Sequence, residues 1–322
     1  MPLSPERNWA GTDGPGIPAA GGSRRGLISK VQRYSTRDGP GIRSTVFCMG
    51  CNLRCLWCSN PELIGGAVQI LYHRERCVRC GSCGALSRGT IRTGPGGCTI
   101  DRERCTNLAE CAAACSYEAW ETVGRTVSPG DLAGTLLRDK VFFDRSGGGV
   151  TFSGGEPALQ PEFVAETAAL LRRGGAQVAL DTAGALAWEA LETAAAKADI
   201  ILYDLKAFDE KLHLACTGVS NALILENAER LAGRGGKLVI RLVLAPGYND
   251  GADLTRRLGF VKSLGAAVTR TDILPLHRLG AGKYRALDMP DPLEGVPECP
   301  AAAAAAAAKE AERMGLTVTI GG

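Results

Sequence analysis

Short apolar segments alternate with longer amphipathic stretches along most of this chain. From residue 43 onward the apolar segments have the length of strands, and the stretches between them have helical spacing. Alternating β and α units of this kind predict an α/β protein with a parallel sheet or barrel. The predicted strands are Thr45–Met49, Gly149–Ser153, Gln177–Thr182, Ile200–Leu205, Leu238–Leu244, Thr269–Leu274 and Leu316–Ile320.

Several helix ends can be read directly from the sequence. Ser128, followed by a proline and by Asp131, predicts an N-cap with a capping box at the start of a helix. Gly265 and Gly315 fit the glycine position that follows a helix. The alanine run Ala301–Ala308 continues into charged residues, so it predicts an alanine-rich helix and not a disordered tract.

One connection interrupts this alternation. About 90 residues separate Cys58 from the strand that begins at Gly149, whereas a βα unit needs far fewer. Seven cysteines lie in that gap, so we interpret it as an inserted small domain built around metal clusters. The first 25 residues are rich in Gly, Pro and polar residues and predict a flexible tail. The predicted division is a tail at 1–25, a core at 26–65 and 124–322, and an insert at 66–123.

Composition and charge narrow the class of protein. The chain has 322 residues, 45% of them hydrophobic, which is typical of a globular protein with a sizeable core. A net charge of +3 gives no electrostatic case for nucleic acid or for an anionic membrane surface. No apolar run is long enough to span a bilayer and no signal-peptide pattern is present, so we expect a cytoplasmic protein.

The cysteines indicate metal chemistry. Of 13 cysteines, eleven lie between Cys48 and Cys115, leaving only Cys216 and Cys299 outside. Disulfide frameworks belong to small secreted domains, and this chain is neither small nor visibly secreted. Metal ligation is therefore the favoured interpretation.

Three cysteines form the most informative motif, Cys51-x3-Cys55-x2-Cys58. A [4Fe–4S] cluster normally takes four cysteines, so a loop that supplies three leaves one iron open to bind something other than protein. The alternative is a zinc loop with a distant fourth ligand, although zinc sites prefer pairs of C-x2-C. Cys48 lies on the preceding strand, and we expect it to point into the core.

The insert resembles a bacterial two-cluster ferredoxin, in which the fourth cysteine of each C-x2-C-x2-C-x3-C repeat serves the other cluster. Crossing the fourth ligands of the two repeats gives one complete set and one incomplete set. The complete set is Cys77, Cys80, Cys83 and Cys115, and the incomplete set is Cys105, Leu108, Cys111 and Ser87. Cys98 is available as a third ligand for the incomplete set. We therefore expect one sound auxiliary cluster and a second that is lost or altered.

The motifs together resemble the radical S-adenosylmethionine enzymes that activate glycyl radical enzymes. The resemblance covers essentially everything after residue 26, in family order. The matching segments are Asp38–Arg43, Cys51–Cys58, Ser59–Glu62, Thr151–Pro157, Asp181–Thr182, Tyr203–Lys206, Thr217–Asn221, Arg241 with Ala245–Gly247, and Leu274–His277.

This resemblance implies the fold and a cofactor pocket. The fold would be a partial (β/α)6 barrel with the Cys51–Cys58 cluster at its carboxyl-terminal rim and a ferredoxin-like insert. Trp57 would offer a face to the adenine, or would pack over the cluster. The segment Ser153, Gly154, Gly155 and Glu156 would meet the amino group of the methionine moiety, because glycines let backbone groups approach a ligand closely. An ordinary strand-end turn is the alternative for these glycines.

Further pocket residues follow from the same resemblance. Asp181, Thr182, Asp204 and the carbonyl of Tyr203 match a monovalent-cation site beside the bound cofactor, although strand-end acids alone are often helix caps. The positions that match the lining of the cofactor pocket are Lys206, Arg241 and His277.

The implied reaction is reductive cleavage of S-adenosylmethionine at the open iron. The 5′-deoxyadenosyl radical then removes a hydrogen from a backbone glycine of a partner glycyl radical enzyme, and a flavodoxin- or ferredoxin-type protein supplies the electron. No general acid or base is required. Two alternatives remain open: a radical enzyme of the same superfamily that acts on a small molecule, and a non-catalytic iron–sulfur electron carrier or redox sensor.

Overall fold

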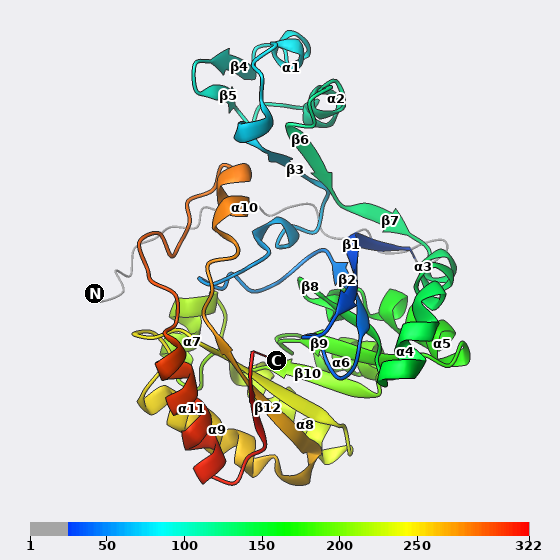
Figure 1. Ribbon diagram of the computed structural model, residues 1–322, viewed down its shortest axis with the longest axis vertical. Coiled ribbons are helices and arrows are strands. Elements are labelled where there is room, and N and C mark those ends of the chain that lie inside the picture. The colour runs from blue at the N-terminus through cyan, green and yellow to red at the C-terminus, as the bar shows by residue number, and fades with distance from the viewer. Residues whose placement is uncertain (1–24, 322) are drawn as a thin grey trace.

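Nine strands form one mixed sheet that runs through the larger part of the molecule in the computed structural model, which describes residues 25–321 (Figure 1). The strand order is β13-β12-β11-β10-β9-β8-β2-β1-β7. Every neighbouring pair from β2 to β13 is parallel, so the carboxyl ends of these strands meet at one edge. The strands are β1 (Gly26–Ser35), β2 (Arg43–Cys48), β7 (Arg125–Val127), β8 (Gly149–Gly154), β9 (Gln177–Thr182), β10 (Ile200–Asp204), β11 (Leu238–Leu244), β12 (Val268–Pro275) and β13 (Val318–Ile320).

The predicted parallel strands are confirmed, with small differences at their ends. Strand β1 was not predicted from the sequence; it pairs antiparallel with β2 on one side and with β7 on the other. The sequence did not reveal β1 because most of its positions are at least partly exposed, so it lacks the continuous apolar run of a buried parallel strand. The predicted tail lies outside the described residues, apart from residue 25.

Helices lie between successive strands and cover the sheet. They are α3 (Pro129–Leu136), α4 (Lys140–Ser146), α5 (Pro161–Arg173), α6 (Trp188–Ala195), α7 (Glu210–Thr217), α8 (Ala222–Gly233), α9 (Ala252–Ser263), α10 (Ala281–Ala286) and α11 (Ala301–Arg313). Short 3-10 helices occur at Pro61–Leu63, Arg74–Arg76, Leu137–Asp139, Pro157–Leu159 and Gly265–Ala267. No helix within residues 25–321 combines the length and apolar character needed to cross a membrane.

The helix signals in the sequence are confirmed. The Ser128 hydroxyl accepts a hydrogen bond from the Asp131 backbone N–H at 3.1 Å and donates to the Asp131 carboxylate at 2.6 Å. Gly265 and Gly315 adopt left-handed φ values of 66° and 84°, as residues that end helices do. The alanine-rich segment forms α11, whose buried stripe is Ala304, Ala307, Ala308 and Ala311.

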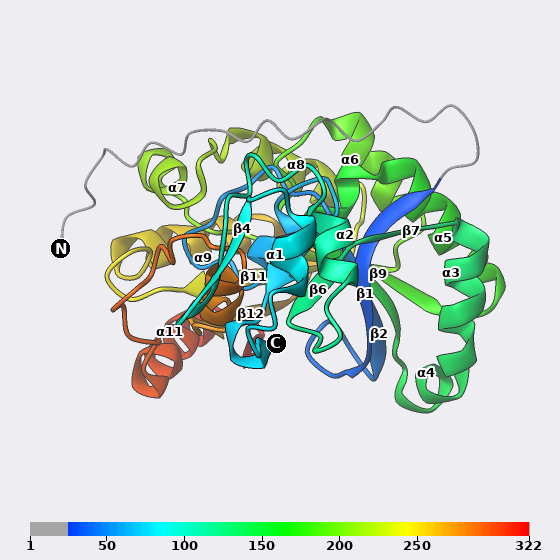
Figure 2. The same cartoon turned by 90° about the horizontal axis from the view of Figure 1, so that it is seen from above.

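Residues 69–123 form a separate lobe at the carboxyl-terminal edge of the sheet (Figures 1 and 2). Its elements are β3 (Gln69–Tyr72), α1 (Ser82–Leu86), β4 (Ile91–Gly94), β5 (Gly97–Ile100), α2 (Leu108–Ala113) and β6 (Trp120–Val123). Strand β3 pairs antiparallel with β6, and β4 pairs with β5. The lobe has its own small core, in which the rings of Tyr72 and Trp120 lie 4.8 Å apart.

Among the described residues, an apolar cluster and an arginine hold this lobe to the rest of the molecule. A small apolar cluster joins Leu71 and Val123 of the lobe to Met49 and Leu63 beside the cysteine loop. The Arg102 guanidinium donates to the carbonyl of Ile70 within the lobe at 2.8 Å and to the carbonyl of Ala286 in α10 at 3.0 Å. Arg102 therefore ties the lobe to helix α10.

Candidate functional site

The loop Cys51–Cys58 follows β2 at the carboxyl-terminal edge of the sheet. Its backbone is fixed from the side of α7, because the Arg54 and Leu56 N–H groups donate to the carbonyls of Thr217 and Cys216 at 2.7 and 2.9 Å. The Cys51 N–H donates to the Ile64 carbonyl at 3.1 Å. The loop is thus held in place by backbone contacts that do not depend on the cysteine side chains.

The three thiols of this loop lie close enough to raise one another's pKa values. Burial raises the pKa of Cys51 to about 12 and raises the pKa values of Cys55 and Cys58 as well. The nearby Lys206 ammonium lowers all three pKa values, but burial outweighs it. Iron binding would therefore displace protons from the thiols. Cys48, as predicted, is fully buried in the hydrophobic core.

The two glycines at the end of β8 lie directly against the backbone that precedes this loop. A Cβ on Gly155 would lie 2.2 Å from the Gly50 carbonyl oxygen, and one on Gly154 would lie 2.7 Å from the backbone of Cys48. Gly154 also has a φ of 104°, which favours glycine. These glycines therefore make room for the chain's own backbone, a structural role that the sequence left open as the alternative to the approach of a ligand.

Glu156 is fully buried behind the glycines. Its carboxylate accepts hydrogen bonds from the Thr182 hydroxyl at 2.7 Å and from the N–H groups of Ala158 and Ala183 at 3.1 and 3.0 Å. Burial raises the pKa of Glu156 to about 7 despite these donors. Glu156 thus links the end of β8 to the end of β9.

A network of partly buried polar groups crosses the strand ends next to Glu156. The Ser153 hydroxyl donates to Asp181 at 2.6 Å, and Arg241 Nη1 lies 2.7 Å from the same carboxylate. Arg241 Nε lies 3.4 Å from Asp204 Oδ1, and Lys206 Nζ lies 2.5 Å from Asp204 Oδ2. The predicted pocket residues of β8, β9, β10 and β11 are therefore brought together.

The charged groups at these strand ends shift one another's pKa values. Burial raises the pKa of Asp181 although Arg241 opposes it. Burial also acts to raise the pKa of Asp204, but Lys206 and Arg241 together hold it below its usual value. Asp204 Oδ1 and Arg241 Nε are buried without a well-directed hydrogen bond, so polar groups remain available to a ligand.

Two of the predicted pocket residues, Trp57 and His277, lie apart from these linked polar groups. Trp57 is packed in the hydrophobic core, and its buried Nε1–H has no hydrogen-bond partner. His277 lies in the segment after β12 with its side chain 53% exposed, and its Nδ1 is 3.3 Å from Glu298 Oε2.

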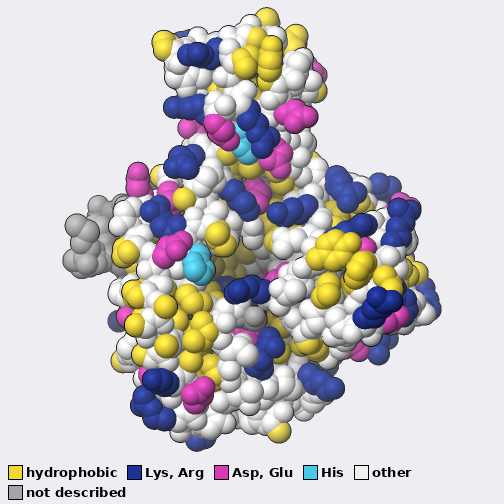
Figure 3. All heavy atoms as spheres, viewed as in Figure 1, with side chains coloured by type: hydrophobic (Ala, Val, Ile, Leu, Met, Phe, Trp, Pro, Cys, Tyr) yellow, Lys and Arg dark blue, Asp and Glu magenta, His cyan; other side chains and the backbone are white. Residues whose placement is uncertain are grey.

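Figure 3 shows a hollow below the lobe on the face shown there, with Lys and Arg side chains along its rim.

Sequence analysis missed two supporting residues. The Asn249 amide donates to the Lys206 carbonyl at 2.7 Å and to the Val243 carbonyl at 2.8 Å, which fixes the backbone of Lys206. Lys283 of α10 donates to Asn60 and Glu62, just after the cysteine loop. Asn249 stands two positions beyond the Ala245–Gly247 motif, so extending that motif would have found it.

The cysteines of the lobe fall into two groups. Five of them line one small cavity: Cys77, Cys80, Cys83, Cys98 and Cys115. Cys105 and Cys111 form the other group, in which both thiols lie close to Asn107 Oδ1, at 3.7 and 3.8 Å. The Ser87 hydroxyl is buried and hydrogen-bonded to the backbone of Gly84 and Ile91. Within residues 25–321, no three Cys, His, Asp or Glu side chains are placed to hold a single metal ion.

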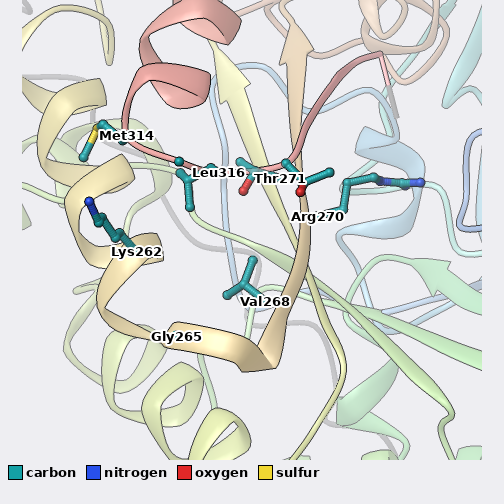
Figure 4. A pocket seen from close by; sticks show the side chains of 9 residues that line it. Lys262, Gly265, Val268, Arg270, Thr271, Met314 and Leu316 are labelled. Atoms are coloured by element: carbon teal, nitrogen blue, oxygen red, sulfur yellow. The ribbon is translucent and has the colours of Figure 1, made fainter.

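A larger cavity of about 230 Å³ lies away from all of these residues. It opens between α9, the start of β12 and the turn that follows α11, at the amino-terminal side of the sheet (Figure 4). Val268, Met314, Leu316 and the stem of Lys262 form its walls. None of the predicted site residues lines it.

Comparison with known proteins gives consistent matches. Residues 45–258 match the Radical SAM superfamily. An isethionate sulfite-lyase activating enzyme from Nitratidesulfovibrio vulgaris is 36% identical over 83% of this chain and 89% of its own. The benzylsuccinate synthase activating enzyme of Thauera aromatica is 37% identical over 92% of each chain. A trans-4-hydroxy-L-proline dehydratase activating enzyme from Clostridioides difficile is 38% identical over 80% of this chain and 86% of its own.

Proposed function

The chain belongs to the radical SAM superfamily, and on that premise we propose that it is an activating enzyme for a glycyl radical enzyme. It would cleave S-adenosylmethionine reductively and direct the 5′-deoxyadenosyl radical to a backbone glycine of the partner. The observation that carries this proposal is a three-cysteine loop close enough to Lys206 for its charge to act on all three thiols. The chain is also similar to activating enzymes over most of its length.

The loop fits the [4Fe–4S] cluster that the family implies. Cys51, Cys55 and Cys58 would hold it, and the core position of Cys48 is consistent with a set of three ligands. When bound, the cluster supplies the electron and an open iron for the amino and carboxylate groups of S-adenosylmethionine. The fixed backbone of the loop would keep the ligands in register as the cluster assembles.

The chain's own residues would bind and orient the cofactor. Asp181, Asp204, Lys206 and Arg241 present fixed charges that suit a zwitterionic amino acid group beside a sulfonium. Ser153, Gly154, Gly155 and Glu156 set the strand end against the cysteine loop, and Thr182 supports Glu156. Trp57 would contact the adenine and His277 would close the pocket at the rim. The charged side chains are only 11–17% exposed, so they would limit the access of water to the radical.

The proposal includes a monovalent cation, although other protein groups already contact the oxygen atoms that would bind it. Asp204 Oδ1, which accepts no hydrogen bond, and the neighbouring Asp181, Thr182 and Tyr203 carbonyl would supply its oxygen ligands. Arg241 now lies between the two carboxylates, and the Thr182 hydroxyl is engaged with Glu156. Cation binding would therefore require Arg241 to turn away, for instance toward the cofactor carboxylate.

We propose a partial (β/α)6 barrel with a ferredoxin-like insert as the finer description of the fold. The parallel order of β2 and β8 to β12, each pair joined by at least one helix, supports the barrel. The boundaries would be 26–65 and 124–322 for the core, 66–123 for the insert and 1–25 for the tail. The β-α-β-β-α-β order of the lobe supports the second part.

The lobe supports one auxiliary [4Fe–4S] cluster better than two. Four of the five cysteines at its cavity are the complete predicted set, Cys77, Cys80, Cys83 and Cys115. At the other site Leu108 packs against the lobe's core, and Ser87 is committed to backbone hydrogen bonds. A second cluster there would have only Cys105 and Cys111.

The partners follow from the proposed reaction. A glycyl radical enzyme would be the protein substrate, and a flavodoxin- or ferredoxin-type protein the electron donor. We place the protein in the cytoplasm, with no role for nucleic acid or a membrane. The partner's glycine loop would have to enter the site from the edge of the sheet that carries the lobe.

Anaerobic assays of the reconstituted protein test this function. Reduced protein should convert S-adenosylmethionine to 5′-deoxyadenosine, and addition of a cognate glycyl radical enzyme should give a glycyl radical by electron paramagnetic resonance. No cleavage by fully loaded protein would refute the enzyme class. Cleavage with no radical in any candidate partner, but with a modified small molecule, would favour the small-molecule alternative.

A further inference from the structure

The cysteine-lined cavity of the lobe has one thiol more than a single cluster needs. Five cysteines line its cavity, whereas a [4Fe–4S] cluster takes four. The extra one by sequence spacing is Cys98, which belongs to neither ferredoxin-type repeat. Its position in the structure, and not its spacing, assigns it to this site.

Cys98 lies among the ligands of the complete set. Its sulfur is 3.8 Å from that of Cys83 and 3.9 Å from that of Cys77. It stands on β5, where its backbone N–H donates to the Tyr72 hydroxyl at 2.8 Å, and it is only 4% exposed. Cys98 is therefore held at the inner wall of the cavity by the strand and by Tyr72.

The surroundings of Cys80 differ from those of the buried Cys98. It is exposed, and it stands between Arg79 and Gly81, which both adopt positive φ values of 61° and 82°. The hydrogen-bond partner of its sulfur is the Ser82 hydroxyl at 3.4 Å. A ligand on an exposed loop is more easily displaced than one on a buried strand.

We propose that Cys98 is a reserve ligand of the auxiliary cluster that exchanges with Cys80. This inference rests on the proposed function only in assuming that the lobe holds a cluster. In the exchange, the bond from iron to the Cys80 sulfur breaks and a bond from iron to the Cys98 sulfur forms. The Cys98 thiol gives up a proton and the Cys80 thiolate takes one, so no electron is gained or lost. The exchange keeps the iron four-coordinate when the exposed ligand leaves.

Iron analysis of full-length variants tests the proposal. The background replaces Cys51, Cys55 and Cys58 by serine, so that all cluster iron belongs to the lobe, about four per chain. Cys80→Ala and Cys98→Ala should each retain this iron, whereas the double variant should lose nearly all of it. The reduced single variants should give different electron paramagnetic resonance spectra, because they differ in one ligand. Cys105→Ala combined with Cys111→Ala is the matched control and should retain the iron.

Several outcomes would overturn the proposal. Loss of iron from Cys80→Ala alone would show that Cys98 cannot replace it, and loss from Cys98→Ala alone would make Cys98 an obligatory ligand. Retention in the double variant would remove both from the site, and zinc in place of iron would refute the cluster.

Alkylation provides a measurement that needs no lobe variant. In the loaded background protein, the exposed Cys80 should be alkylated in part, because it is free whenever Cys98 binds the iron; mass spectrometry identifies the product. Complete protection of Cys80 would contradict the exchange, and reactivity as high as in the iron-free protein would remove Cys80 from the cluster. Neither measurement uses a partner enzyme, so the result stands apart from whether the protein activates one.

Discussion

The Lys283 ammonium of α10 lies 2.6 Å from the carboxylate of Glu62, which follows the cysteine loop and is 7% exposed at its side chain. It also donates to Asn60 Oδ1 at 2.6 Å. The Gly280 position at the start of the same helix approaches the Cys58 carbonyl so closely that a Cβ there would lie 2.4 Å from it. Helix α10 is therefore a support for the loop that carries the three thiols.

Replacing Lys283 by methionine should destabilise this loop. The change leaves a nearly buried carboxylate without its cation, which should lower the free energy of unfolding by about 3 kcal/mol. Urea unfolding and the rate of iron loss to a chelator would measure the two effects. Lys140→Met is the matched control, because its pair with Asp144 is exposed and should contribute about 0.3–0.5 kcal/mol. Equal effects of the two changes would contradict the role of Lys283.

Replacing glycine by alanine should have opposite effects at Gly155, which lies close to Gly50, and at Gly259. Gly155→Ala forces a Cβ against a backbone oxygen, so it should cost about 2–3 kcal/mol and impair cluster retention. Gly259→Ala lies inside α9 with open space around it and should stabilise the protein by about 1 kcal/mol. Thermal unfolding and iron content distinguish them, and a neutral Gly155→Ala would show that the strand end moves freely.

Arg241 should be needed for both stability and cofactor cleavage. Arg241→Gln removes the cation between Asp181 and Asp204, and both carboxylates then repel each other in a buried setting. We expect a loss of about 3 kcal/mol in unfolding free energy and at least a roughly tenfold slower cleavage of S-adenosylmethionine. Arg104→Gln, which breaks an exposed pair with Asp101, should change neither by a comparable amount. Unchanged cleavage in Arg241→Gln would remove Arg241 from the pocket.

The raised pKa of Glu156 predicts a dependence of stability on pH. Burial raises this pKa from 4.5 to about 7, so the folded protein holds the proton more tightly than the unfolded chain does. The contribution of Glu156 to stability should therefore fall as the pH rises from about 4.5 to about 7 and stay constant above that. Urea unfolding at several pH values should show this slope in the wild type and a weaker slope in Glu156→Gln. Glu162→Gln, at an exposed position of α5, should leave the slope as it is.

The sequence predicted those parts of the molecule that depend on local signals. Parallel strands such as Gln177–Thr182 are buried on both faces, so they appear as continuous apolar runs, and the Ser128 cap contacts a residue three positions away. The strand ends also placed Asp181 and Asp204 at one edge of the sheet. Strand β1 was missed because its polar, partly exposed face hides it among loops.

The contacts that could not be predicted join distant parts of the chain. Lys283 and Glu62 are 221 positions apart, and nothing local to either residue identifies the other. The same holds for Arg241, whose position between two carboxylates depends on the relative placement of three strands. Cys98 follows no repeat spacing, and only the pairing of β4 with β5 carries it to Cys77 and Cys83.

The six-residue helix α10 receives Arg102 of the lobe at Ala286 and holds the segment after Cys58 through Lys283. The lobe and the loop Cys51–Cys58 thus share one short helix as a common support. We expect a protein that binds the lobe to act on the position of the loop through α10, without contact to the thiols.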